Sequence, residues 1–384
     1  MRSRQGFQNW MYCALVGILG LYASTYQTLV SRLTERFGMD ERMIGILLAV
    51  YGAGSLCSVL ISGMLADSLG KRRIVLCAAP VMCLGLLCAA TAGAAALLFA
   101  GLFLAGMGFG PSESMSSAML TDENPGASTR WMNVSQIFFG AGAVAAPLAV
   151  TWYLSRAGAS TSGAMLICAA AVFACWALLA LTSRGRMGRP AAVQRDLNPF
   201  TVLKNREFLL YAVLVFLYLS YESVAPAYFK QLFLQRGAGE STANMVISVF
   251  WTAILLSRLL GAFMDGREKT CIIALSPLVA AGALLALFAP NDALRMAGVA
   301  IYGFGCGPVW PMLFVLAARV FPNRSGASYA VMMLFSQAGN SLSPAVIGAG
   351  VNNVEATFAI CAALALVVAA GGFAARRRGA AHSA

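Results

Sequence analysis

Apolar residues dominate the chain in long runs, and short polar stretches separate one run from the next. Twelve runs are long enough to cross a membrane as helices of about 20 residues. They fall at residues 10–31, 42–65, 74–92, 95–120, 132–155, 163–183, 208–230, 243–264, 271–289, 293–317, 328–350 and 355–375. The pattern predicts an all-α membrane protein of twelve transmembrane helices with little structure outside the bilayer.

The composition supports this prediction and excludes a water-soluble globule. Of the 384 residues, 59% are hydrophobic and 11% are charged, against about 45–50% and about 25% in ordinary soluble domains. The ten cysteines lie almost entirely within the apolar runs and form no Cys-x-x-Cys pair, so we interpret them as small packing residues. Arg2 and Arg4 precede the first run as in a signal peptide, but no small-residue cleavage site follows, and we interpret this run as a mature helix.

The net charge is +12, and the distribution of the basic residues over the loops orients the predicted helices. Most of the 27 basic residues fall in segments that lie on one side if the helices alternate in direction. The positive-inside rule places that side, with both termini, in the cytoplasm, and we expect a multi-pass inner-membrane protein. The basic residues form no patch with interleaved aromatic residues, so nucleic acid is not an expected partner.

The longest connection, residues 184–207, divides the predicted helices into six and six. It contains several basic residues together with Pro190 and Pro199. We expect an N-terminal six-helix bundle at 1–183, a cytoplasmic linker, and a C-terminal bundle with a short basic tail at 208–384. A basic segment beside the inner leaflet could also bind anionic lipid.

The two halves of the sequence repeat each other at a nearly constant offset. Helix-breaking and close-packing residues recur 197 residues later, with the last two pairs at 198: Gly106 as Gly303, Gly108 as Gly305, Gly110 as Gly307, Pro111 as Pro308, Gly142 as Gly339, Pro147 as Pro344, Gly63 as Gly261 and Asp67 as Asp265. This repeat predicts two pseudo-symmetric six-helix bundles, an architecture that binds its solute where the repeats meet.

A charged loop follows the second predicted helix. Asp67 ends that helix, where the helix dipole is negative, and therefore needs a cation or the N-terminus of another helix nearby. The run from Gly63 to Arg73, GMLADSLGKRR, resembles the loop between the second and third helices of the major facilitator superfamily. The resemblance implies the family's fold and a conformational gate that locks the cytoplasmic side. We assign to the gate Gly63, Asp67, Gly70, Lys71, Arg72, Arg73, Asp265 of the degenerate second copy, and Arg258.

Three charged residues stand away from the ends of predicted helices, where each is costly and therefore a functional candidate. Glu113 and Glu222 could exchange a proton as their surroundings alternate between wet and dry, or could make satisfied interhelical hydrogen bonds. Arg258 could bind an anionic substrate, although we favour snorkelling or pairing with Asp265.

The glycine-rich fourth span before Glu113 resembles that of fucose-permease-like sugar:proton symporters, as do Tyr221-Glu222 and the segment GCGPVWP at 305–311. In that branch the fourth-span glutamate takes part in substrate binding and coupling, a role that the resemblance implies for Glu113. The sequence departs from the branch at 21–28, where the expected acid is absent. Proton-coupled efflux of drugs or metabolites is the alternative, although the fourth span has no arginine and Ala146 precedes Pro147.

Aromatic and amide side chains on several predicted helices could line a solute cavity, where rings stack on a sugar and amides bond its hydroxyls. The same side chains could equally be packing residues. The candidates are Tyr22, Tyr26, Gln27, Gln136, Tyr221, Tyr302, Trp310, Gln337 and Asn340.

The residue inventory argues against an enzyme. His382 is the single histidine, which excludes a His-x-x-x-His metal site and a histidine-based triad, and no P-loop occurs. We therefore expect no metal and no cofactor, with a proton gradient as the energy source. The expected protein is a monomeric secondary transporter that moves a small polar solute by alternating access; a receptor without transport is the second alternative.

Overall fold

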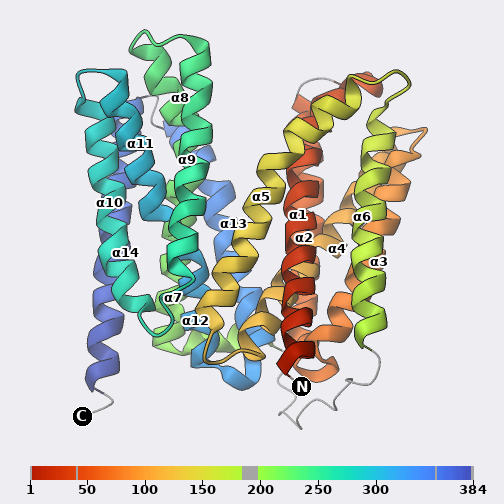
Figure 1. Ribbon diagram of the computed structural model, residues 1–384, viewed down its shortest axis with the longest axis horizontal. Helices are drawn as coiled ribbons and strands as arrows, with labels where there is room; N and C mark the ends of the chain where they lie inside the picture. The colour runs from red at the N-terminus through yellow and green to blue at the C-terminus, as the bar shows by residue number, and fades with distance from the viewer. Residues whose placement is uncertain (1, 40–41, 184–197, 351–352, 382–384) are drawn as a thin grey trace. The chain divides into compact units, whose positions relative to one another are not determined.

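The computed structural model describes residues 2–39, 42–183, 198–350 and 353–381. The linker predicted at 184–207 falls largely outside them. The described chain is helical and forms two compact units (Figure 1). Unit 1 comprises Met1–Asn124, Ser135–Pro199 and Pro322–Met333, and unit 2 comprises Pro125–Val134, Phe200–Phe321 and Leu334–Ala384.

Unit 1 is built mainly from the first six helices. These are α1 (Arg2–Arg36), α2 (Arg42–Leu69), α3 (Lys71–Ala90), α4 (Ala95–Asp122), α5 (Ser128–Leu154) and α6 (Thr161–Ser183). Helix α4 runs through the interior: its side chains from Gly108 to Thr121 are all buried. The first turns of α5 belong to unit 2.

Unit 2 is built mainly from the remaining helices. These are α7 (Arg206–Glu222), α8 (Ala225–Gln235), α9 (Glu240–Gly261), α10 (Glu268–Phe288), α11 (Asp292–Cys306), α12 (Val309–Val320), α13 (Ser325–Gly350) and α14 (Val354–Ala381). Two 3-10 turns, Pro199–Lys204 and Pro322–Arg324, precede α7 and α13. The first turns of α13 belong to unit 1.

The expected twelve spans are recovered when α7 is joined to α8 and α11 to α12. Within the described residues, nine helical segments are long and apolar enough to cross a membrane, and these two joined pairs are among them. The fold confirms the predicted twelve-helix, two-bundle architecture. The seventh and tenth spans are nevertheless not the continuous helices that we expected, because each is interrupted near its middle.

Glycines at repeat-related positions lie against the backbone of a neighbouring helix in both units. A Cβ atom at Gly106 of α4 would lie 2.1 Å from the backbone oxygen of Tyr51 in α2. A Cβ atom at Gly303 of α11 would lie 2.6 Å from the backbone oxygen of Phe250 in α9. In both units glycine therefore allows two helix backbones to approach in direct contact.

Candidate functional site

An aromatic cluster in unit 1 joins three helices. Tyr22 and Tyr26 of α1, Tyr51 of α2 and Phe109 of α4 pack with ring centroids 5.3 to 6.5 Å apart. The hydroxyl oxygens of all three tyrosines are buried, and none has a hydrogen-bond partner among the described residues. Because a buried hydroxyl without a partner is costly, these groups are suited to bind water or a solute hydroxyl.

Glu113 lies one helical turn beyond Phe109 on α4, so the two share a face of the helix. Its side chain is buried, and it lies near enough to the Tyr51 hydroxyl to act on it electrostatically. No cation stands within salt-bridge distance among the residues that the structure describes. Ser117, one turn further, has a buried hydroxyl that also lacks a partner in the described chain. The structure thus brings together Tyr22, Tyr26 and Glu113, which we predicted, with Tyr51 and Ser117, which we did not.

The second buried carboxyl, Glu222, lies in unit 2 opposite a cation. Arg258 of α9 approaches it at 4.0 Å, and both side chains are buried. The Arg258 Nε also donates to the backbone oxygen of Gly307 at 3.0 Å. Our expectation that Arg258 snorkels or pairs with Asp265 is wrong: the side chain is buried and lies beside a carboxylate on another helix.

The predicted gate residues of unit 1 meet the first turns of α13. A Cβ atom on Gly63 of α2 would lie 2.3 Å from the Ala330 side chain, so α2 and α13 are in close contact. Gly70 adopts a positive φ of 92° and separates α2 from α3. Lys71 forms an ion pair with Asp122 at 3.1 Å, and Asp122 also accepts from the Ser325 hydroxyl at 2.8 Å.

The other predicted gate residues of unit 1 are Asp67, Arg72 and Arg73. Arg72 is buried and Arg73 is exposed. The side chain of Asp67 lies outside the described residues, so its predicted role stays a prediction.

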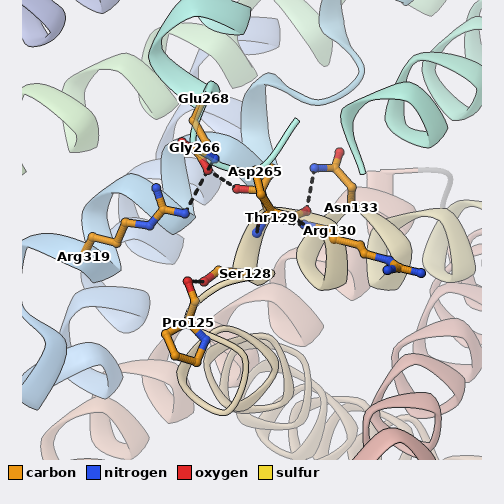
Figure 2. Close-up of polar contacts among 9 residues, drawn as sticks. All are labelled: Pro125, Ser128, Thr129, Arg130, Asn133, Asp265, Gly266, Glu268 and Arg319. Atoms are coloured by element: carbon orange, nitrogen blue, oxygen red, sulfur yellow. Dashed lines mark hydrogen bonds and ion pairs between the residues drawn. The ribbon is translucent and has the colours of Figure 1, made fainter. Parts of the chain in front are cut away.

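Asp265 of unit 2 caps the start of α5 (Figure 2). Its Oδ1 accepts from the backbone N–H of Thr129 at 2.8 Å, and its Oδ2 lies 3.3 Å from the N–H of Arg130. Helix N-termini leave such N–H groups unsatisfied and carry the positive end of the dipole. The carboxylate therefore fits this place both as an acceptor and as a charge.

Glu268 completes the same cluster (Figure 2). Its Oε1 accepts from the Thr129 hydroxyl, from the Gly266 N–H at 2.9 Å and from Arg319 at 2.9 Å. Sequence reasoning missed Thr129, Glu268 and Arg319, yet the repeat could have found two of them. Lys71 and Asp122 recur 197 residues later as Glu268 and Arg319, and both pairs are ion pairs, with the charges exchanged.

The other predicted cavity residues divide between the units. In unit 1 Gln27 is exposed and Gln136 is buried. In unit 2 Tyr221 is buried and Tyr302 donates from its hydroxyl to the Tyr221 backbone oxygen at 2.9 Å. The remaining three, Trp310, Gln337 and Asn340, also belong to unit 2. Trp310 is buried and donates to the Ser336 hydroxyl at 2.9 Å. The side chains of Gln337 and Asn340 are exposed. These hydrogen bonds fix the positions of Tyr302 and Trp310, and the cavity role of both residues stays a prediction.

The site chemistry consists of carboxyl, phenol, hydroxyl and guanidinium groups. Within the described chain, no group of three or more His, Cys, Asp or Glu side chains is placed to hold a metal ion. The groups present can hydrogen-bond a solute and exchange protons.

Sequence comparison assigns the chain to a family. The profile of the Major Facilitator Superfamily matches residues 12–344 and, in a second match, 210–383. The chain belongs to the major facilitator superfamily. Among curated relatives, an uncharacterised transporter of this superfamily from Yersinia pestis is 25% identical, with 92% of each chain covered. The membrane protein MosC of Rhizobium meliloti is 23% identical, with 86% of this chain and 80% of MosC covered.

Solved structures with the same fold include sugar transporters of the superfamily. The Escherichia coli fucose:proton symporter FucP superposes with a TM-score of 0.77 at 15% identity, covering 96% of this chain and 98% of FucP. The proton:xylose symporter XylE superposes with a TM-score of 0.73 at 16% identity, covering 96% and 95%. At these identities the likeness shows the shared fold. The protein is thus a major facilitator transporter and not an enzyme.

Proposed function

We propose that this transporter moves a small, hydroxyl-rich solute together with a proton, and that Glu113 carries the proton. The observation that supports this most directly is the unit 1 cluster of buried tyrosine hydroxyls without partners beside the buried Glu113. Aromatic faces with hydroxyls at their edges suit a sugar, whose C–H faces stack on rings and whose hydroxyls need hydrogen bonds.

Coupling follows from the cost of a buried charge. A carboxylate without a cation in low dielectric is unfavourable unless it gains a proton or a counter-charge. A neutral solute brings no charge, so Glu113 binds it best in the protonated form. Proton and solute then favour each other's binding, which is the thermodynamic requirement for symport.

Efflux of an organic cation in exchange for protons is the second candidate, and the same cluster favours it. Aromatic faces beside an unpaired carboxylate also attract an ammonium group. A cation would compete with the proton for Glu113 instead of binding with it. The two functions therefore predict opposite effects of pH on solute binding.

The experiment is a thermal-shift screen of the purified protein with sugars, organic acids, amino acids and lipophilic cations at two pH values, since a bound ligand raises Tm. A neutral solute that stabilises more at the lower pH supports symport, whereas a cation that stabilises more at the higher pH supports exchange. In proteoliposomes without internal solute, Glu113→Gln should abolish the accumulation of the identified solute that a pH gradient drives. In proteoliposomes preloaded with that solute, the same variant should retain counterflow. Normal accumulation by Glu113→Gln would refute the coupling role.

We further propose that the clusters at the starts of α5 and α13 form the conformational gate implied by the loop at Gly63–Arg73. The support is that both helix starts are held by carboxylates, Asp265 for α5 and Asp122 for α13. We also propose that both termini lie in the cytoplasm, because most basic residues fall in the loops on the same side as the termini.

A further inference from the structure

Lys269 ties three helix ends of unit 2 together. It stands in the first turn of α10 and donates from its Nζ to the Glu207 carboxylate, in the first turn of α7, at 3.2 Å. The same Nζ donates to the backbone oxygen of Ala375, in the last turns of α14, at 3.1 Å. The start of α7, the start of α10 and the end of α14 therefore meet at one end of the unit (Figure 1).

Basic residues gather where these three helix ends meet. Five of them lie within three residues of Glu207, Lys269 or Ala375 in the sequence, and all five are exposed: Lys204, Arg206, Arg267, Arg376 and Arg377. None of the five forms an ion pair with an acid in the part of the chain that the structure describes. We call these five residues, together with Lys269, the basic end.

The acids nearest to the basic end already have partners. Glu207 pairs with Lys269 at 3.2 Å, and Glu268 is buried and pairs with Arg319 at 2.9 Å. Asp265 accepts from the backbone N–H of Thr129 at the start of α5. The basic end therefore presents an excess of exposed positive charge.

The length of α14 places this charge at the surface of the bilayer. The helix has 28 residues, about 42 Å at 1.5 Å per residue, whereas the hydrocarbon core is about 30 Å thick. About 20 residues counted from Val354 cross that core and reach Phe373. The Phe373 ring is exposed, and the Arg377 guanidinium lies 4.6 Å from its centre. An aromatic ring beside an arginine is typical of the headgroup level.

We propose that the basic end binds the headgroup of an anionic phospholipid. A lipid phosphodiester carries a negative charge and oxygen acceptors that guanidinium groups bind in a bidentate manner. Leu366 and Phe373 are seven residues apart on α14, share one face of the helix and are both exposed. They supply the apolar surface along which an acyl chain of the same lipid lies.

Two other roles of the same cations predict a different result. Cations at the end of α14 stabilise the negative end of its dipole, and cations in loops orient the helices during insertion. Neither role depends on the headgroup that surrounds the folded protein. A stabilisation that depends on the headgroup therefore distinguishes binding from both.

Thermal unfolding of the purified full-length protein in nonionic micelles tests the proposal. Phosphatidylglycerol and phosphatidylcholine with the same acyl chains are added in separate titrations, and Tm is followed by tryptophan fluorescence, since a ligand of the folded state raises Tm. We expect phosphatidylglycerol to act at a roughly tenfold lower concentration than phosphatidylcholine, because each cation near the headgroups contributes up to about fivefold in affinity. Salt at about 0.5 M should reduce this difference.

Variants on two helices locate the binding. Arg376→Gln combined with Arg377→Gln should remove most of the preference for phosphatidylglycerol, and Arg267→Gln, at the start of α10, should reduce it by up to about fivefold. Arg156→Gln is the matched control. Arg156 follows α5 on the opposite side of the membrane, and its guanidinium lies 4.4 Å from the centre of the Trp152 ring, as Arg377 lies beside Phe373. Its loss removes the same charge and the same kind of ring contact, and the preference should persist.

Equal effects of the two lipids on the unmodified protein would overturn the proposal. So would a preference that survives in both the double variant and Arg267→Gln, or one that Arg156→Gln removes equally, because the response would then follow the total charge. Inorganic phosphate should not raise Tm, and a rise equal to that with phosphatidylglycerol would show a general anion site. The inference does not involve Glu113, so it holds or fails independently of the proposed proton coupling.

Discussion

Single charged side chains in this protein act through the backbone groups that they reach. Asp265 accepts from two N–H groups at the start of α5, and Arg258 donates to an oxygen that a proline has left free. The sequence marked both residues as important but placed Arg258 with the wrong partner. Seven residues separate Arg258 from Asp265, whereas Glu222 is 36 residues away, and helix packing alone decides which carboxylate the guanidinium meets.

Asp265→Ala should destabilise the protein by about 1–2 kcal/mol, because it removes both an acceptor and a charge at a helix N-terminus. Asp265→Asn keeps an acceptor oxygen and should cost about half as much. The measurement is the free energy of unfolding from denaturant titration in mixed micelles. Glu355→Gln removes a charge from the exposed first turn of α14 together with the exposed ion pair to Arg236; it is the control and should cost less than about 1 kcal/mol. Equal losses for the two Asp265 variants would show that the charge contributes nothing.

Helices of this fold were predictable from hydrophobic runs, but their interruptions were not. Pro80, Pro111 and Pro277 all stand inside continuous helices, whereas Pro308 and Pro311 lie at a break. Proline is tolerated in membrane helices when neighbouring groups satisfy the freed oxygen. Each of the three continuous helices contains one proline, whereas Pro308 and Pro311 together remove two N–H donors within one turn. The hydrophobic runs from which we predicted the helices do not register that spacing.

Close approach between helix backbones predicts which glycines tolerate a methyl group. Gly106→Ala places a Cβ atom 2.1 Å from the Tyr51 oxygen, which only a separation of α2 from α4 can relieve. We expect a loss of about 1–3 kcal/mol, as for other overpacked interiors. Gly52 lies inside α2, where an added Cβ atom would have nothing within 4 Å, so Gly52→Ala should be neutral or stabilise by about 0.5–1 kcal/mol.

Thermal unfolding followed with a thiol-reactive dye measures both glycine variants, since six of the ten cysteines are buried and react on unfolding. Gly106→Ala should lower Tm and Gly52→Ala should not. A Gly106→Ala protein with unchanged Tm would mean that α2 and α4 adjust freely. Because Tyr51 belongs to the aromatic cluster, Gly106→Ala should also weaken the solute-induced rise in Tm.

At the scale of the whole molecule, the repeat preserves positions more faithfully than residue types. The offset of 197 was readable from glycines and prolines, and it correctly predicted two bundles. It did not reveal the ion pairs, because Lys71 and Asp122 are replaced by Glu268 and Arg319. Charge exchange leaves the attraction unchanged but removes the residue identity from which we recognised the offset, so the second pair is found only when positions 197 residues apart are compared for opposite charges.

This exchange predicts that the pair in unit 1 should tolerate reversal. Lys71→Glu places two acids together and should destabilise by about 1–2 kcal/mol, whereas Lys71→Glu combined with Asp122→Lys should recover at least half of that loss. The recovery has a local reason: a lysine at 122 can still hydrogen-bond the Ser325 hydroxyl, which Asp122 now accepts from. The solvent-exposed pair Arg236–Glu355 is the control, for which the same double-mutant cycle should give about 0.2–1 kcal/mol. If the reversed pair in unit 1 recovers nothing, the site needs the carboxylate at 122 itself, and the two ion pairs are not interchangeable versions of one contact.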